Sequence, residues 1–106
     1  MSKYHNKITP RGDKVFDSKR EADRYTELSL LQSAGLIENL QLQKEFELIP
    51  KQKDERAVKY IADFYYYDSE KACYVAEDVK GMRTQAYIIK RKLFKYRYPD
   101  ILFREV

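Results

Sequence analysis

Two aspartates and one lysine in the middle of the chain have types and spacing suited to metal-dependent hydrolysis of a phosphodiester. Asp63 interrupts a run of aromatic and β-branched residues, where a carboxylate is costly to bury. Side chains alternate along a strand, so Asp78 and Lys80 share one face, about 6 to 7 Å apart at roughly 3.3 Å per residue, while Glu77 points the other way. If the two segments pair as antiparallel strands, Asp63 comes close to Asp78 and the three groups form one site.

Such a site has the components that phosphodiester hydrolysis requires. Mg²⁺ prefers hard oxygen ligands, which Asp63 and Asp78 supply, and it polarises a phosphate and lowers the pKa of an attacking water. Lys80 is placed to orient that water or to offset the negative charge that grows on the phosphate. The alternative reading of the same spacing is an ion-pair ladder on a solvent-facing sheet.

A helix is predicted upstream of these strands. Ser18 is its expected N-cap, Glu21 completes a capping box three residues later, and Gly35 ends it. The capping box explains Glu21 without any catalysis. On a helical wheel, however, Glu21 falls between Tyr25 and Leu28 in the apolar arc, so its carboxylate could also approach the sheet.

The rest of the chain alternates between extended segments and one further helix. Asp68 to Lys71 are expected to form a hairpin turn, Thr84 to cap the second helix, and Pro99 to stop it after about Tyr98. The predicted strands span residues 36–42, 45–49, 57–67, 72–80 and 101–106. This order predicts an α/β fold, a central mixed sheet of four or five strands flanked by two helices. At 106 residues the chain is expected to form one domain, 15–106, after a flexible N-terminal tail, 1–14.

Composition narrows the classes of protein to which the chain can belong. No apolar run approaches the roughly 20 residues of a bilayer span, and the first residues lack the apolar core of a secretory signal. Cys73 is the only cysteine, which excludes an internal disulfide and fits a reducing cytoplasm. From residue 80 onward the chain carries eight cations and two acids, enough to neutralise several phosphates.

The predicted second helix holds most of these cations. Two of them, Lys90 and Arg97, fall between its two apolar arcs, where they either extend to solvent or reach a phosphate near Lys80. The others point to the opposite side, where they either contact a DNA backbone or stay solvated. The candidate DNA-binding residues are Lys90, Arg91, Lys92, Lys95 and Arg97.

Several stretches, taken in order, resemble the PD-(D/E)xK nuclease superfamily and, more narrowly, a family of small phage-encoded proteins of uncharacterised function within it. They are FDSKREADRY, LQLQKEFEL, YIADFYY, VAEDVKG and KRKLFKYRYPD. Ala62 stands where the signature has its proline. The resemblance implies a restriction-endonuclease-like core with Asp63, Asp78 and Glu21 as metal ligands and Lys80 as the catalytic lysine. Gln43 is a further candidate for lining the site.

The resemblance also implies a function and a setting. It implies an endodeoxyribonuclease dependent on Mg²⁺ or Mn²⁺, acting in the cytoplasm of a bacterial host. A structure-specific enzyme that resolves Holliday junctions would be a homodimer making paired cuts; this substrate is an analogy. Two alternatives remain open: a DNA-binding accessory protein that uses a nuclease scaffold without activity, and a protein-interaction module whose charges only keep it soluble.

Overall fold

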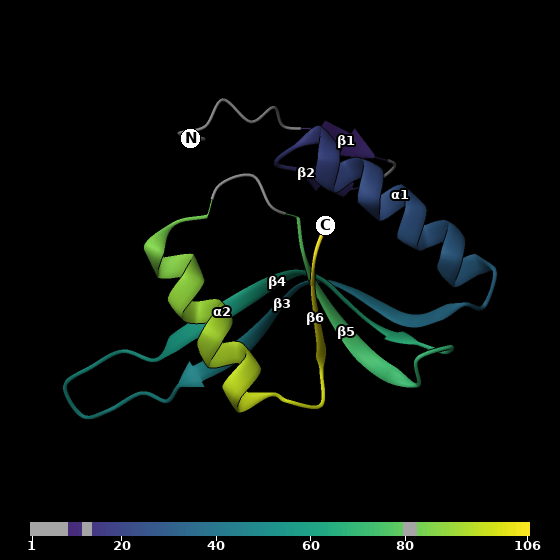
Figure 1. Ribbon diagram of the computed structural model, residues 1–106. Helices are drawn as coiled ribbons and strands as arrows, with labels where there is room; N and C mark the ends of the chain where they lie inside the picture. The colour runs from purple at the N-terminus through teal and green to yellow at the C-terminus, as the bar shows by residue number, and fades with distance from the viewer. Residues whose placement is uncertain (1–8, 12–13, 80–82) are drawn as a thin grey trace.

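The computed structural model describes residues 9–11, 14–79 and 83–106. They form an α/β fold in which two helices flank a four-stranded mixed sheet, as the sequence predicts (Figure 1). The helices are α1 (Lys19–Ser33) and α2 (Gln85–Arg97). The strands are β1 (Thr9–Arg11), β2 (Lys14–Phe16), β3 (Ile37–Ile49), β4 (Val58–Asp68), β5 (Cys73–Asp78) and β6 (Leu102–Glu105).

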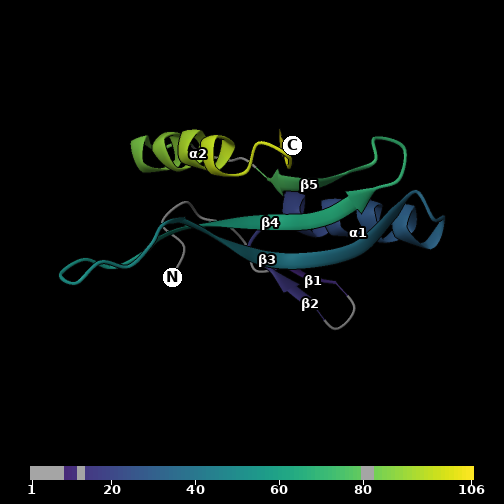
Figure 2. The same cartoon turned by 90° about the horizontal axis from the view of Figure 1, so that it is seen from below.

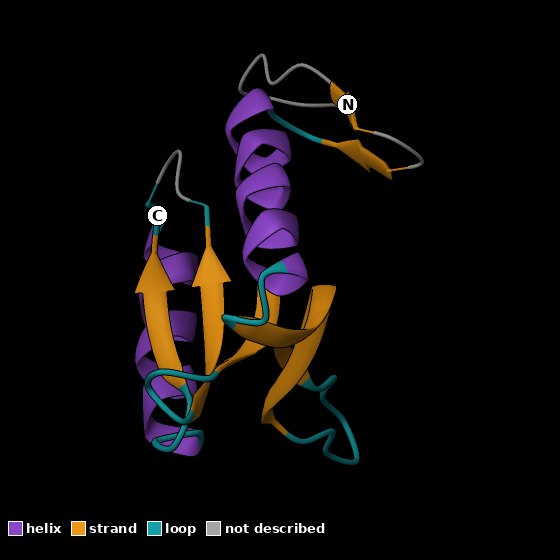
Figure 3. Ribbon diagram, turned by 90° about the vertical axis from the view of Figure 1, so that its right-hand side faces the viewer, coloured by secondary structure: helices purple, strands orange, loops and turns teal. Residues whose placement is uncertain are grey.

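The main sheet has the strand order β3-β4-β5-β6. Its first three strands are antiparallel neighbours joined by hairpins, whereas β6 runs parallel to β5. Parallel neighbours need a crossover connection, which α2 provides (Figure 3). The carboxyl ends of β5 and β6 therefore lie side by side, which matters for the site described below.

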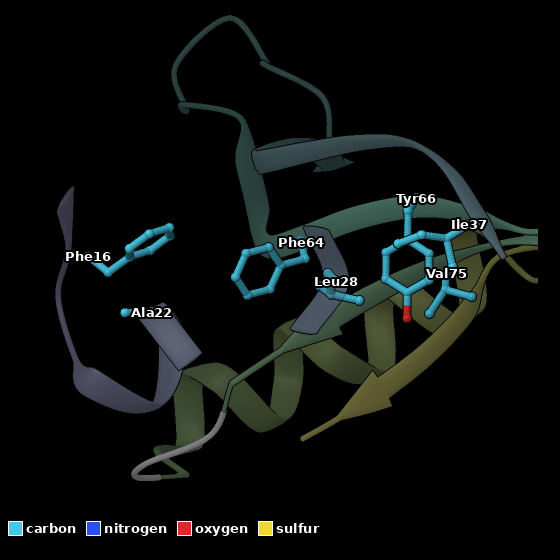
Figure 4. Packing of buried hydrophobic residues seen from close by; sticks show 7 residues of the cluster. All are labelled: Phe16, Ala22, Leu28, Ile37, Phe64, Tyr66 and Val75. Carbon is cyan, nitrogen blue, oxygen red and sulfur yellow. The ribbon is translucent and has the colours of Figure 1, made fainter. Parts of the chain in front are cut away.

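The sheet has a separate hydrophobic cluster on each face. On β5, Val75 packs in the cluster that includes Leu28 of α1, and the next residue, Ala76, packs in the cluster that includes Phe94 of α2. Because neighbouring side chains of a strand point to opposite faces, the two helices cover opposite faces of β5. Figure 2 shows the helices apart from each other along the sheet, and Figure 4 shows the packing of the first cluster.

The apolar side chains of the two long strands β3 and β4 pack in one cluster and then in the other. Leu42 and Phe64 are register partners in the α1 cluster, whereas Phe46 and Tyr60, also partners, pack in the α2 cluster. The register between these two pairs is unbroken, and the even-numbered residues remain the more buried ones in both strands, so the same side of the strands packs against one cluster and then against the other. Gln43, with a φ of 53°, lies at this point of β3.

Most element boundaries agree with the sequence prediction. Ser18 caps α1 by accepting a hydrogen bond from the Glu21 amide, and Thr84 caps α2 by accepting one from the Tyr87 amide. Two differences appear. The expected strands 36–42 and 45–49 form one continuous strand. In addition, β1 lies within the predicted tail, residues 1–14, and pairs with β2, which begins at the last residue of that segment. The predicted tail residues 1–8 lie outside the described residues.

Candidate active site

Asp63 and Asp78 meet where β4 and β5 run side by side. The register pairs Phe64 with Glu77, so the next residues along, Asp63 and Asp78, stand opposite each other. Asp63 Oδ2 accepts a hydrogen bond of 2.7 Å from the Val79 amide. The Tyr60 hydroxyl donates to Asp78 Oδ2 at 2.9 Å. The sequence analysis anticipated the two aspartates but not Tyr60.

Glu21 is the third carboxylate of this region. It lies in the first turn of α1 and is 9% exposed. Its Oε1 accepts a hydrogen bond of 3.2 Å from the Gln43 side-chain amide. Burial raises the pKa of Glu21, and the charges of Asp17 and Asp78 raise it further. Both sequence-predicted neighbours, Glu21 and Gln43, therefore contact each other beside the aspartate pair.

Burial and neighbouring negative charges raise the pKa values of groups around the aspartate pair. Burial raises the pKa of Asp63 to about 7, against the effect of the Val79 amide, which lowers it. The nearby charges of Glu21 and Asp78 raise it further. Burial, followed by the charge of Asp78, also raises the pKa of Tyr60, so this phenol stays a neutral hydrogen-bond donor. Three carboxylates thus share a region that contains more negative charge than its burial favours.

A buried ion pair on the other face of β5 fixes α1 against this region. Glu77 is fully buried. Arg24 of α1 donates two hydrogen bonds to its carboxylate, one of 2.8 Å from Nε and one of 2.6 Å from Nη2. The Tyr66 hydroxyl donates a third hydrogen bond to the Glu77 carboxylate. Since Arg24 lies one turn after Glu21 on α1, and Glu77 precedes Asp78 on β5, this pair sets the distance between Glu21 and Asp78.

The donor set suits a divalent cation in its chemistry. Carboxylate oxygens are the ligands that Mg²⁺ prefers, and Mg²⁺ is usually bound through one or two protein carboxylates together with waters and substrate phosphates. Asp63 and Asp78 are two such groups that stand opposite each other, and Glu21 is within electrostatic range. Across residues 9–11, 14–79 and 83–106, no three acidic, histidine or cysteine side chains are arranged so that together they could hold a metal ion.

A comparison with known protein families covers almost the whole chain. The model of one family matches residues 1–105, and its description is "Protein of unknown function (DUF1064)". The chain belongs to this family. No curated protein and no solved structure matched the chain.

The remaining site predictions for this DUF1064 domain fall on α2 and on residue 80. Lys80 lies outside the described residues. On α2, Arg97 donates a 2.9 Å hydrogen bond to the Leu48 carbonyl, which ties the end of the helix to β3. Lys92 is exposed and Lys90 half-buried, while the Lys95 ammonium lies 5.6 Å from the Phe103 ring centroid. The described helices include none with the length and apolarity to cross a membrane.

Proposed function

We propose that this protein is a metal-dependent endonuclease that hydrolyses phosphodiester bonds of DNA. The observation that supports the proposal is that Asp63 and Asp78 stand opposite each other on the paired strands β4 and β5, with Glu21 close enough for its charge to act on Asp63. Burial is the main reason that the pKa of Asp63 is raised, and the nearby negative charges of Glu21 and Asp78 raise it further. A divalent cation held by Asp63 and Asp78, with Glu21 as a third ligand acting through a bound water, would offset this negative charge and polarise the scissile phosphate.

The protein's own groups would prepare this chemistry in three ways. The Tyr60 hydroxyl and the Val79 amide each occupy one oxygen of a carboxylate, which fixes the direction in which the other oxygen points. Gln43 does the same for Glu21. Lys80, two residues after Asp78 in the sequence, would offset charge on the reacting phosphate.

The proposal extends to the setting of the enzyme. Branched DNA such as a Holliday junction is the substrate that the sequence resemblance suggests, and paired cuts in such a junction need a homodimer. The same resemblance suggests a phage or prophage protein that acts in the cytoplasm of the bacterial host. A DNA-binding accessory protein without activity is the second candidate, favoured by the cations of α2.

A cleavage assay separates these candidates. Linear, nicked, flapped and four-way-junction DNA are incubated with the protein with and without Mg²⁺ or Mn²⁺. The expected result is metal-dependent cleavage that falls at least 100-fold in Asp78→Asn and Lys80→Ala, the order of loss when a group that stabilises the transition state is removed. Asp54→Asn, a matched charge change in the exposed loop between β3 and β4, should cut like the parent. Equal cleavage by parent and Asp78→Asn would show that the site is wrongly assigned.

A further inference from the structure

A second charged cluster lies directly beside the aspartate pair. Its centre is Glu105, at the end of β6, which is the register partner of Asp78 on the parallel neighbour β5. The Val106 amide donates to the Asp78 carbonyl at 3.0 Å, so the two strand ends are held together. Neighbouring strands lie about 4.8 Å apart, and this cluster therefore begins one strand away from the carboxylates of the proposed active site.

Glu105 and Asp78 present their side chains to the same face of the sheet. Asp78 accepts a hydrogen bond from the hydroxyl of Tyr60, which packs in the α2 cluster. Glu105 accepts a 2.5 Å hydrogen bond from the hydroxyl of Tyr87 on α2. The charge of Asp78 is one of the causes that raise the pKa of Tyr87, after burial and the hydrogen bond to Glu105. The two carboxylates thus lie on the same face of the sheet, the face that α2 covers.

Two arginines converge on Glu105. Arg83, just before α2, makes hydrogen bonds of 2.8 Å from Nη2 and 3.4 Å from Nε to its two oxygens. Arg91 Nη1 of α2 lies 3.6 Å from Oε2. The hydrogen bond from Arg83, then that from Tyr87, lowers the pKa of Glu105 to about 2, so this carboxylate is ionised at neutral pH.

This arrangement has the properties of a phosphate site that holds a carboxylate in its place. A guanidinium binds a carboxylate and a phosphate with the same forked geometry. The Arg83 side chain is 56% exposed and the Glu105 side chain 23%. An ion pair this accessible to solvent contributes little to stability, so replacing the Glu105 carboxylate by another anion costs little free energy. A DNA strand that approaches Asp63 and Asp78 meets negative charge there and needs cations close by.

We propose that Arg83 and Arg91 bind a DNA backbone phosphate next to the proposed cleavage site, and that Glu105 occupies their guanidinium groups until DNA arrives. The proposal rests on the proposed function only in taking DNA as the ligand. Arg83, Tyr87 and Glu105 are not among the site residues that the sequence predicts, and Arg91 has Glu105 as a specific partner. Tyr87 is a positioning residue in this proposal because it orients Glu105.

The test is DNA binding in EDTA, measured by fluorescence anisotropy with a fluorescein-labelled duplex and a labelled four-way junction at several salt concentrations. Arg83→Gln and Arg91→Gln should each weaken binding by about 3- to 10-fold and reduce the salt slope by about 1. Glu105→Gln should tighten binding by a similar factor and steepen the slope, because it releases both arginines. A change in DNA affinity opposite in sign to that of the arginine variants is the outcome that distinguishes this proposal.

A matched control separates the local effect from net charge. Glu45→Gln removes the same charge from an exposed pair with Lys59, 3.3 Å apart, on β3 and β4. It should change affinity less than twofold. The proposal is overturned if Glu105→Gln binds no tighter than Glu45→Gln, or if Arg83→Gln keeps the affinity and salt slope of the parent. If Glu105→Gln melts far below the parent, the exposed Arg83 variant decides alone.

The outcome is independent of cleavage. A protein that shows these affinity changes but never cuts DNA would overturn the nuclease proposal and support the phosphate site. A protein that cuts DNA while all three variants bind DNA like the parent would support the nuclease proposal and overturn the phosphate site.

Discussion

Replacing Arg24 by leucine should strongly destabilise the fold. Arg24 donates two hydrogen bonds to Glu77, whose side chain has no exposed surface. Without the guanidinium, the Glu77 carboxylate keeps only the hydrogen bond from Tyr66 and remains a buried, uncompensated charge. Breaking a buried pair in this way costs about 3–5 kcal/mol, a large part of the stability of a domain this size.

Urea unfolding, followed by far-ultraviolet circular dichroism at pH 7, measures this cost. Tyr66→Phe should lose only about 1–2 kcal/mol, because the ion pair itself survives. The matched control is Lys19→Ala, which breaks an exposed pair with Asp23 on the same helix and should cost less than about 0.5 kcal/mol. The double variant Arg24→Leu/Glu77→Leu should be more stable than Arg24→Leu alone, since it leaves no charge buried.

One result would refute this reasoning: an Arg24→Leu protein that unfolds within about 1 kcal/mol of the parent. It would mean that water reaches Glu77 freely, and that the pair does not hold α1 against β5. The argument that Arg24 sets the position of Glu21 would then fail as well.

Three further predictions concern the acidic site and the helix that carries Glu21. The pKa of Asp63 is raised from 3.8 to about 7 in the folded chain. Between these pH values the folded chain holds a proton that the unfolded chain releases. The contribution of Asp63 to stability is therefore present below about pH 4 and is lost as the pH rises through about 7. Asp63→Asn should therefore match the parent at pH 4 and exceed it by about 2 kcal/mol at pH 8 in urea unfolding; equal stability at both pH values would contradict the raised pKa. At pH 8, saturating MgCl₂ should raise the melting temperature of the parent by several degrees in differential scanning fluorimetry but leave Asp78→Asn unchanged, and a similar rise in both would place the cation elsewhere. Ser18→Ala should cost about 1 kcal/mol in urea unfolding by removing the cap of α1, whereas no loss would show that another group caps the helix.

Local signals in the sequence were sufficient to predict the elements. Ser18 and Thr84 could be recognised as caps because a short hydroxyl side chain just before an amphipathic run satisfies the free amides of the first turn. Alternation along β5 correctly separated Glu77 from Asp78, which the structure places on opposite faces. The polar turn between the aromatic-rich run of β4 and the second strand correctly predicted that β4 and β5 pair antiparallel.

Features that depend on contacts distant in sequence could not be predicted in this way. Glu77 and Arg24 are far apart along the chain, and no local sequence feature of either residue indicates that the two form an ion pair. The positive φ of Gln43 could not be predicted either, because glutamine has no preference for the left-handed region. The arginines around Glu105 meet only because β6 runs parallel to β5, which a tertiary crossover determines.

The division of apolar side chains into two clusters has a consequence for how the molecule opens. Each helix protects its own part of the sheet, so native-state amide exchange should resolve two cooperative units of different free energy, one that releases α1 and one that releases α2. β4 and β5 contribute to both, and their amides should exchange last. The aspartates lie on these two strands, so the acidic pair should persist through partial openings that detach either helix.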